Sequence, residues 1–295
     1  NFQPFILVSV ITSAALIPIL LTKKKPPNFK KIQAMSLKEL YEASPFGIIS
    51  SLFYGTIQSA LFTLLAVYAT SMNFTILEIS IVTFLLAVSG AVAQFPVGKI
   101  SDIYDRRKVI VFSTFGAAIF AIIAIFVSRQ MYLPGGLATS KTWFYIFFIL
   151  FSFCSLPMFS LILAHTNDFI SKDKFVAAGA GLQFAFGLGA MSGPFLCSIF
   201  MDLTGPNGFF VFLFIFHTFI GLFGIYRMKV RKSVDNPDSQ FVAMPQTITP
   251  AGIELNPTTE HIEEPYSEKV KEILERKGVK YKKEVDDDKI DEQAY

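Results

Sequence analysis

The segment GKISDIYDRRKVI, residues 98–110, concentrates charge in an otherwise apolar part of the chain. Its charged side chains are Lys99, Asp102, Asp105, Arg106, Arg107 and Lys108. Residues 79–98 before it and 109–128 after it contain no Lys, Arg, Asp or Glu. Basic side chains at such a place bind the headgroup layer of a membrane with about 1 kcal/mol each, and a carboxylate is stabilised at a helix N-terminus. The segment is therefore expected to be a turn that holds two apolar helices in register, with its basic side chains on lipid headgroups.

Histidine and cysteine are the other residues that could carry chemistry. His165 lies at the end of an apolar stretch and His217 lies within one, and neither has an acidic companion in its own stretch. His217 could exchange a proton near physiological pH, although a hydrogen-bonded structural histidine is the favoured interpretation. Cys154 and Cys197 have no metal-ligand spacing and are expected to be packing residues. The sequence therefore predicts no enzyme, no cofactor or metal site, and no nucleic-acid partner.

The elements that must position these residues are membrane-spanning helices. Hydrophobic residues make up 52% of the 295 residues and charged residues 17%, whereas about a quarter of the residues in soluble domains are charged. A bilayer core about 30 Å thick requires about 20 apolar residues in a helix. The stretches that meet or approach this length are 4–21, 45–70, 79–98, 109–128, 142–164, 175–199 and 208–226. The predicted fold class is an all-α integral membrane protein with seven transmembrane helices and a C-terminal tail.

Positive charge alternates between the two sides of the predicted membrane. Sixteen Lys and Arg lie in 22–44, 98–110, 165–174 and 227–232, against two in 71–78, 129–141 and 200–207. Because cytoplasmic loops carry an excess of Lys and Arg, the basic loops and the C-terminus are expected in the cytoplasm. The chain begins at Asn1 without a methionine, so we expect its first span to be an internal helix whose predecessors are missing.

Part of the charged segment matches a known loop signature. The residues that reproduce the pattern G-x-x-x-D-[RK]-x-G-R-[RK] are Gly98, Asp102, Arg106 and Arg107, while Ile103 and Asp105 depart from it. The segment thus resembles the cytoplasmic loop signature of the major facilitator superfamily, which lies between helices 2 and 3, with a weaker copy between helices 8 and 9. The departures favour the second copy. Residues 187–194, GLGAMSGP, resemble a glycine–proline signature of the same family.

The resemblance implies the C-terminal half of a twelve-helix bacterial permease, preceded by helix 6. Residues 1–21 would be the last helix of a missing N-terminal half, 22–44 a basic cytoplasmic linker, and 45–232 the six-helix C-terminal half. Residues 233–295 would form an acidic, mostly flexible cytoplasmic tail with a short helix near 267–277. The protein would be a multi-pass protein of the bacterial plasma (inner) membrane.

Polar and small residues within the spans are the remaining site candidates. Polar side chains seldom face lipid, so the candidates for lining a solute cavity are Tyr54, Gln58, Gln94 and Gln183. The alternative is hydrogen bonding between helices, worth about 0.6 kcal/mol. Gly189 and Gly193 permit close helix contact, and Pro194 should kink its helix because it lacks a backbone donor.

The function implied by the resemblance is secondary active transport of a small solute by alternating access. Gly98, Asp102, Arg106 and Arg107 would form its gating loop. The expected partners are a small-molecule substrate, membrane lipids and the missing N-terminal half, with coupling to a proton left open. The alternatives are a seven-span receptor or sensor and a membrane scaffold. A retinal-binding receptor would need a lysine in its last span, and residues 208–226 have none.

Overall fold

The structure is a computed structural model that describes residues 2–14, 17, 35–130, 137–171, 174–231 and 241. The second part of the predicted first span, most of the predicted linker, and the tail with its expected helix near 267–277 lie outside these residues. The described part of the chain is helical, with no strand. This confirms an all-helical architecture.

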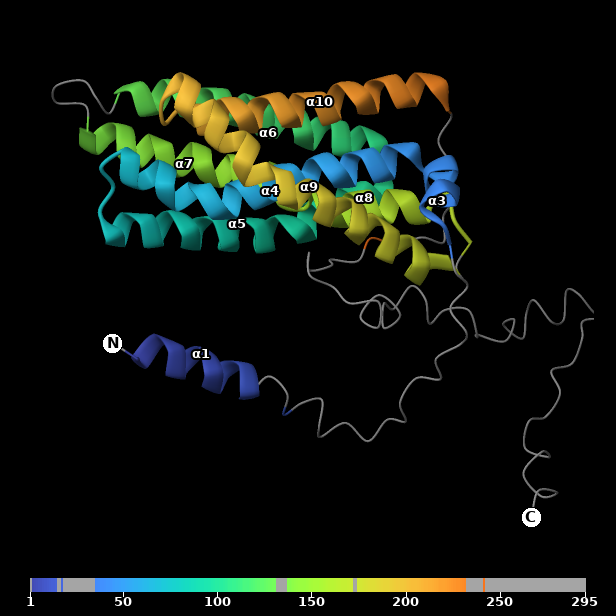
Figure 1. The fold of residues 1–295 in the computed structure, drawn as a ribbon, viewed down its shortest axis with the longest axis horizontal. Coiled ribbons are helices and arrows are strands. Elements are labelled where there is room, and N and C mark those ends of the chain that lie inside the picture. Colours follow the sequence, from blue (N-terminus) through green and yellow to red (C-terminus); the bar gives the residue numbers. More distant parts are fainter. Residues whose placement is uncertain are drawn as a thin grey trace, which may run out of the picture.

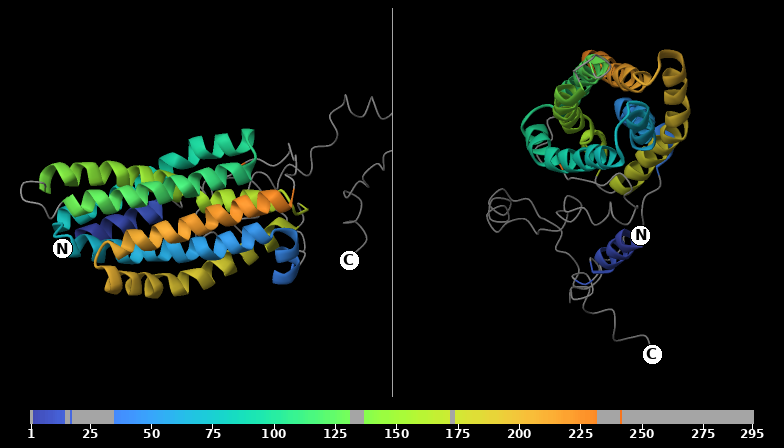
Figure 2. Two further views of the ribbon diagram at one scale, coloured as in Figure 1. Left: turned by 90° about the horizontal axis from the view of Figure 1, so that it is seen from above. Right: turned by 90° about the vertical axis from the view of Figure 1, so that its left-hand side faces the viewer.

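Six apolar segments of the described chain are long enough to cross a membrane, and each coincides with a predicted span. They are α4 (Pro45–Ser71), α5 (Ile76–Ile103), α6 (Arg106–Gln130), α7 with α8 (Leu137–Ser155 and Met158–Asn167), α9 (Phe175–Thr204) and α10 (Gly208–Val230). They form one bundle with neighbouring helices side by side (Figures 1 and 2). A helix can cross the bilayer because its backbone groups are hydrogen-bonded within the segment, so these six apolar helices are those expected of a multi-pass membrane protein.

The two remaining helices are short. The helix α1 (Gln3–Ala14) is apolar, its described side chains are exposed, and it lies apart from the bundle in Figure 1 and in the right-hand view of Figure 2. Because its described length falls short of a span, the described residues hold six spans where the sequence predicted seven. The helix α3 (Leu37–Ala43) lies inside the predicted linker, and the Ser36 side chain caps it by accepting from Glu39 N–H.

The helix α4 packs most extensively against α9, and glycines set their separation. Ser51 Oγ donates to the Leu182 carbonyl at 2.8 Å. A Cβ on Gly55 would strike the backbone of Phe186, and one on Gly189 would strike that of Leu52. Contacts therefore advance along both helices in the same direction, with the backbones touching as small residues allow.

The predicted span 142–164 is divided into α7 and α8 by a turn at Leu156–Pro157. Proline has no N–H and its ring clashes with the preceding turn of a helix, so it frees carbonyls upstream. Within the turn itself, the Leu156 carbonyl accepts the hydroxyl of Tyr54 at 3.1 Å. A polar side chain of α4 thus stabilises a break that was not predicted. Pro194, by contrast, lies inside the uninterrupted helix α9, which is bowed along its length (Figure 2).

The bundle leaves two helices comparatively uncovered. Of the apolar windows, those of α5 and α9 are the least buried, at 28% and 22%. The large exposed residues of α5 include Phe84, Val88, Val92 and Phe95, and those of α9 include Phe184, Leu188, Met191 and Phe195. Each set recurs every three to four residues, which places it on one helix face.

Candidate functional site

The charged segment forms a tight turn between α5 and α6. Tyr104 caps the end of α5 by donating its N–H to the Ile100 carbonyl at 3.0 Å. The carbonyl of Asp105 accepts from the N–H groups of Lys108 and Val109 at 2.9 and 3.2 Å, and so opens α6. Only two residues therefore separate the helices, and the side chains of the signature lie close together.

Arg106 connects the ends of three helices. Its side chain is only 6% exposed. Nη2 donates to Asp102 Oδ1 of α5 at 3.0 Å, and Nη1 donates to Asp168 Oδ1 at 2.6 Å and to the Ala164 carbonyl at 3.0 Å. Asp168 is the C-cap of α8. Two carboxylates on a buried guanidinium make charge-assisted hydrogen bonds, the stronger kind, so Arg106 holds α5 and α8 to the start of α6.

Arg107 makes a second connection, toward α10. Its Nε and Nη2 donate to the two carboxylate oxygens of Asp105 at 3.2 and 2.9 Å, and its Nη1 donates to the Arg231 carbonyl at 2.6 Å. Burial alone raises the pKa of Asp105, but the hydrogen bonds from Arg107 outweigh it and hold that pKa below its ordinary value. Asp105, a departure from the family signature, is thus the ion-pair partner of a signature residue.

The expectation that Arg106 and Arg107 bind lipid headgroups is wrong for these two residues. Both are buried, at 6% and 5% exposed, and their guanidiniums are engaged by protein carboxylates and carbonyls. The physical reason is that Asp102, Asp105 and Asp168 lie within hydrogen-bonding distance and offer full negative charges in a partly buried site. Lys108 of the same segment is exposed, as the expectation required.

A residue of the C-terminal tail also reaches the signature. The backbone N–H of Phe241 donates to Asp102 Oδ1 at 2.7 Å, and a Cβ on Gly98 would strike the Phe241 ring. The sequence predicts a mostly flexible tail, and it singles out neither Phe241 nor Asp168 as a site residue. The one available signal was that Asp168 is an acidic residue in a loop expected to be basic, on the same side as the signature.

The predicted cavity candidates separate into two groups. Tyr54 and Gln58 are buried within the bundle, at 0% and 3% exposed, whereas Gln94 and Gln183 are half-buried. Neither atom of the Gln58 amide has a hydrogen-bond partner among the described residues, and neither does Gln183 Oε1. Buried polar groups without partners are rare in proteins. That any of the four lines a solute cavity stays a prediction.

His217 is a hydrogen-bonded residue of the bundle interior. Its Nδ1–H donates to the Leu213 carbonyl at 2.8 Å, which leaves Nε2 to accept the Ser155 hydroxyl at 2.9 Å. Its ring packs edge-on against Phe151 with centroids 5.5 Å apart. It is fully buried. This is the structural role favoured from the sequence, and it leaves no ring nitrogen for a solute.

Within the described ranges, no group of three or more His, Cys, Asp and Glu is placed to hold a metal ion. Cys154 and Cys197 are unpaired, and Cys197 is fully buried in the apolar core. The described site therefore consists of ion pairs at one end of a helix bundle, with glycine-mediated packing behind it.

The bundle and its charged turn are those of a transporter family. The family model described as "Major Facilitator Superfamily" matches residues 47–275. This match covers well over half of the chain, so the chain belongs to the major facilitator superfamily. The match begins near the start of α4 and includes all six long helices.

Several curated proteins of this family are similar to the chain. The "Uncharacterized MFS-type transporter YE1530" of Yersinia enterocolitica is 22% identical over 80% of this chain and 57% of its own length. The "Uncharacterized MFS-type transporter YfkF" of Bacillus subtilis is 25% identical over 60% of this chain and 44% of its own length. The chain thus spans about half the length of the relatives it matches. No solved structure matches it. None of these similarities supports the receptor or sensor alternative.

Proposed function

We propose that this chain is the C-terminal half of a secondary active transporter that moves a small solute across a bacterial inner membrane by alternating access. The observation that carries the proposal is the position of Arg106, which joins α5, α6 and α8 through Asp102 and Asp168. Such a set of ion pairs at one end of a bundle stabilises one arrangement of helix ends over another, as a conformational switch requires.

The uncovered faces of α5 and α9 support the same proposal. An N-terminal half would pack against them and enclose a cavity near the membrane midplane, where transporters of this type bind their solutes. The loop side would be cytoplasmic, because it carries the Lys and Arg excess. The acidic tail would then also be cytoplasmic, and Phe241 would contact Asp102 there.

The experiment is a flux measurement on cells or proteoliposomes that contain the complete protein, with a panel of labelled sugars, amino acids and cationic drugs. Any solute that the wild type moves should be moved at least about five-fold more slowly by the Asp102→Asn variant, which weakens the ion pair with Arg106 by about 1 kcal/mol. Asp202→Asn is the matched control, because no ion pair among the described residues involves Asp202. Equal flux through both variants and the wild type, at equal amounts in the membrane, would refute the gating role.

A further inference from the structure

The short helix α3 is docked on α9 by an ion pair and an apolar contact. Glu39 Oε1 accepts from Lys174 Nζ at 2.6 Å, and Lys174 is the N-cap residue of α9. The side chain of Leu40 is buried, at 1% exposed, and a Cβ on Gly181 of α9 would strike it. A helix of only 7 residues is not stable alone in water. Contacts with the bundle therefore determine whether α3 forms.

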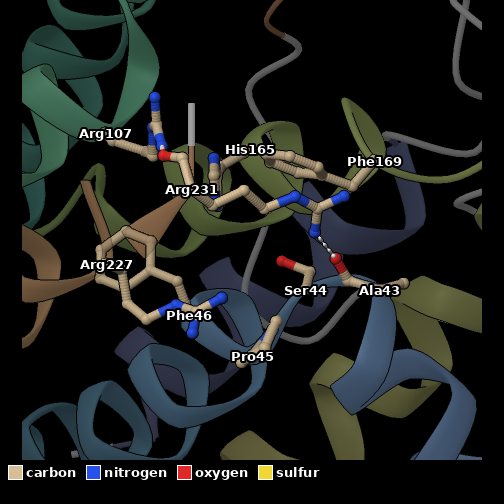
Figure 3. A pocket seen from close by; sticks show the side chains of 9 residues that line it. All are labelled: Ala43, Ser44, Pro45, Phe46, Arg107, His165, Phe169, Arg227 and Arg231. Carbon is tan, nitrogen blue, oxygen red and sulfur yellow. Dashed lines mark hydrogen bonds between the residues drawn. The ribbon is translucent and has the colours of Figure 1, made fainter. Parts of the chain in front are cut away.

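Arg231, the C-cap of α10, connects α3 to two further helix ends. Its Nη1 donates to the carbonyl of Ala43, the last residue of α3, at 2.7 Å. Its guanidinium lies over the ring of Phe169, which follows α8, at 4.3 Å from the centroid, and a cation in this position is attracted to the ring. Figure 3 shows the Arg231 side chain extended past Phe169 toward Ala43, with the hydrogen bond dashed. One side chain thus joins the ends of α3, α8 and α10.

The backbone of the same residue reaches the charged turn. The Arg231 carbonyl accepts from Nη1 of Arg107 at 2.6 Å, and Arg107 is paired with both carboxylate oxygens of Asp105. Hydrogen bonds from a guanidinium are charge-assisted and therefore of the stronger kind. A continuous series of contacts thus runs from Ala43 through Arg231 and Arg107 to Asp105 in the turn between α5 and α6.

The helix ends around Arg231 are closely packed. The space between them, which Ala43, Arg107 and Arg231 help to line (Figure 3), has room for about one water molecule. The rings of Phe46 and His165 belong to the same lining and pack edge-on with centroids 5.2 Å apart. Because close-packed interiors transmit a displacement rather than absorb it, a shift of one of these helix ends should move the others.

We propose that Arg231 is a positioning residue that couples α3, in the predicted linker, to the charged turn. Its side chain holds the end of α3, and its carbonyl holds the guanidinium of Arg107, so a displacement of α3 reaches the turn and a displacement of the turn reaches α3. Hydrogen bonds and packed side chains carry such coupling when the elements that they join have two arrangements. A part for Arg231 in gating rests on the proposed function, whereas the coupling itself does not.

The test is hydrogen–deuterium exchange of the complete protein in detergent, followed by mass spectrometry in α3 and in the charged turn. Arg231→Gln should raise the exchange rates of both segments by about five-fold, as expected for the loss of one hydrogen bond. Arg231→Lys keeps a donor and a positive charge over the ring, and its rates should stay within about two-fold of the wild type. The start of α5, at the opposite end of the bundle, should exchange as in the wild type, which separates lost coupling from general loosening.

Arg107→Gln tests the same coupling from the other side. In the described chain Arg107 makes no hydrogen bond to α3, yet its replacement should raise the exchange rate of α3, because coupling is reciprocal. In the Arg231→Gln background it should raise that rate no further. Lys229→Gln is the matched control, since Lys229 is an exposed basic residue in the last turn of α10 and has no hydrogen bond or ion pair within the described ranges.

Unchanged exchange of the charged turn in Arg231→Gln, or an equal rise in Lys229→Gln, would overturn the coupling. These results require no solute and are therefore independent of the transport proposal. Flux decides the part in gating: Arg231→Gln should slow it as Asp102→Asn does, and Arg231→Lys should not. Slow flux in Asp102→Asn with normal flux in Arg231→Gln would exclude Arg231 from the gate. Normal flux in both would refute the gating role of the turn itself, and the exchange rates would still decide the coupling.

Discussion

The guanidinium of Arg106 and the carboxylate of Asp168 lie 2.6 Å apart, although 62 residues separate them in the chain. The pair is well shielded from solvent, with side chains 6% and 13% exposed. It joins the first residue of α6 to the C-cap of α8, and Asp102 extends it to the last turn of α5. The family signature is therefore part of a network whose other half comes from a segment outside the signature.

A double-mutant cycle should show strong coupling between these two residues. Arg106→Gln removes the guanidinium that Asp102 and Asp168 share, and Asp168→Asn removes the less exposed of the two carboxylates on Arg106. Breaking a buried pair from one side costs up to about 3–5 kcal/mol. The double variant should lose at least about 1 kcal/mol less than the sum of the two single variants. Unfolding free energies in detergent measure this. The more exposed pair of Glu39 and Lys174, at 2.6 Å, is the control and should show coupling of at most about 1 kcal/mol. Additivity at both pairs would contradict the prediction.

Asp105 should make the stability of the protein depend on pH in the acid range. Its pKa in the folded state lies below the ordinary value of 3.8, so the unfolded chain binds the proton more readily. The stabilisation is therefore complete at neutral pH and is lost as the pH falls below about 4. Asp105→Asn should flatten this part of the profile of unfolding temperature against pH. Asp202→Asn should keep the wild-type profile, and a change of equal size there would show that the effect is not specific.

Two glycines of α9 offer a matched test of helix packing. A Cβ on Gly189 would strike the Leu52 carbonyl, whereas a Cβ on Gly187 would have no atom within 4 Å. Gly189→Ala should therefore destabilise the protein by about 1–3 kcal/mol. Gly187→Ala should leave stability unchanged or raise it by up to about 1 kcal/mol, because alanine favours the helix. Thermal unfolding of both variants decides the matter, and the reverse order would mean that α4 and α9 do not meet at Gly189.

Gln58 should be an unfavourable residue for stability. Its buried amide has no described hydrogen-bond partner, so the desolvation cost of that amide, about 1–3 kcal/mol, is not offset. Gln58→Met keeps the length of the side chain and should raise the unfolding temperature. Ser51 belongs to the same helix as Gln58. Ser51→Ala removes the hydrogen bond to the Leu182 carbonyl and should lower the unfolding temperature. If Gln58→Met also abolishes flux of a solute, then the amide serves solute binding. A lower unfolding temperature for Gln58→Met would contradict the prediction.

The spans were predictable because their signal is local. Twenty apolar residues bounded by charge define a membrane helix without knowledge of its neighbours, and α10 begins at the predicted residue. The helix α3 carried a signal that was not used, since Ser36 and Glu39 have the spacing of a capping box. Pro157 likewise carried the signal for the break between α7 and α8.

The site was predictable only in part. Gly98, Asp102, Arg106 and Arg107 are close in sequence and come together in one turn. Their outside partners do not follow from periodicity or spacing, because a contact between Arg106 and Asp168 depends on how α6 packs against α8. The burial of Tyr54 was not predictable for the same reason. The sequence pattern of a polar residue on a helix face is the same whether that face lines a cavity or contacts a carbonyl of another helix.

The most direct test of the gating role is the water accessibility of two positions on α9, one in the part nearer the charged turn and one at the opposite end. In a background without Cys154 and Cys197, single cysteines replace Phe184, nearer the charged turn, and Leu203, at the opposite end, both of which are exposed. Their rates of reaction with N-ethylmaleimide are measured with and without Asp102→Asn. The account predicts that this variant raises the rate at position 184 by about five-fold, equivalent to about 1 kcal/mol, and lowers the rate at position 203. Rates that are unchanged at both positions, or that rise together, would contradict it.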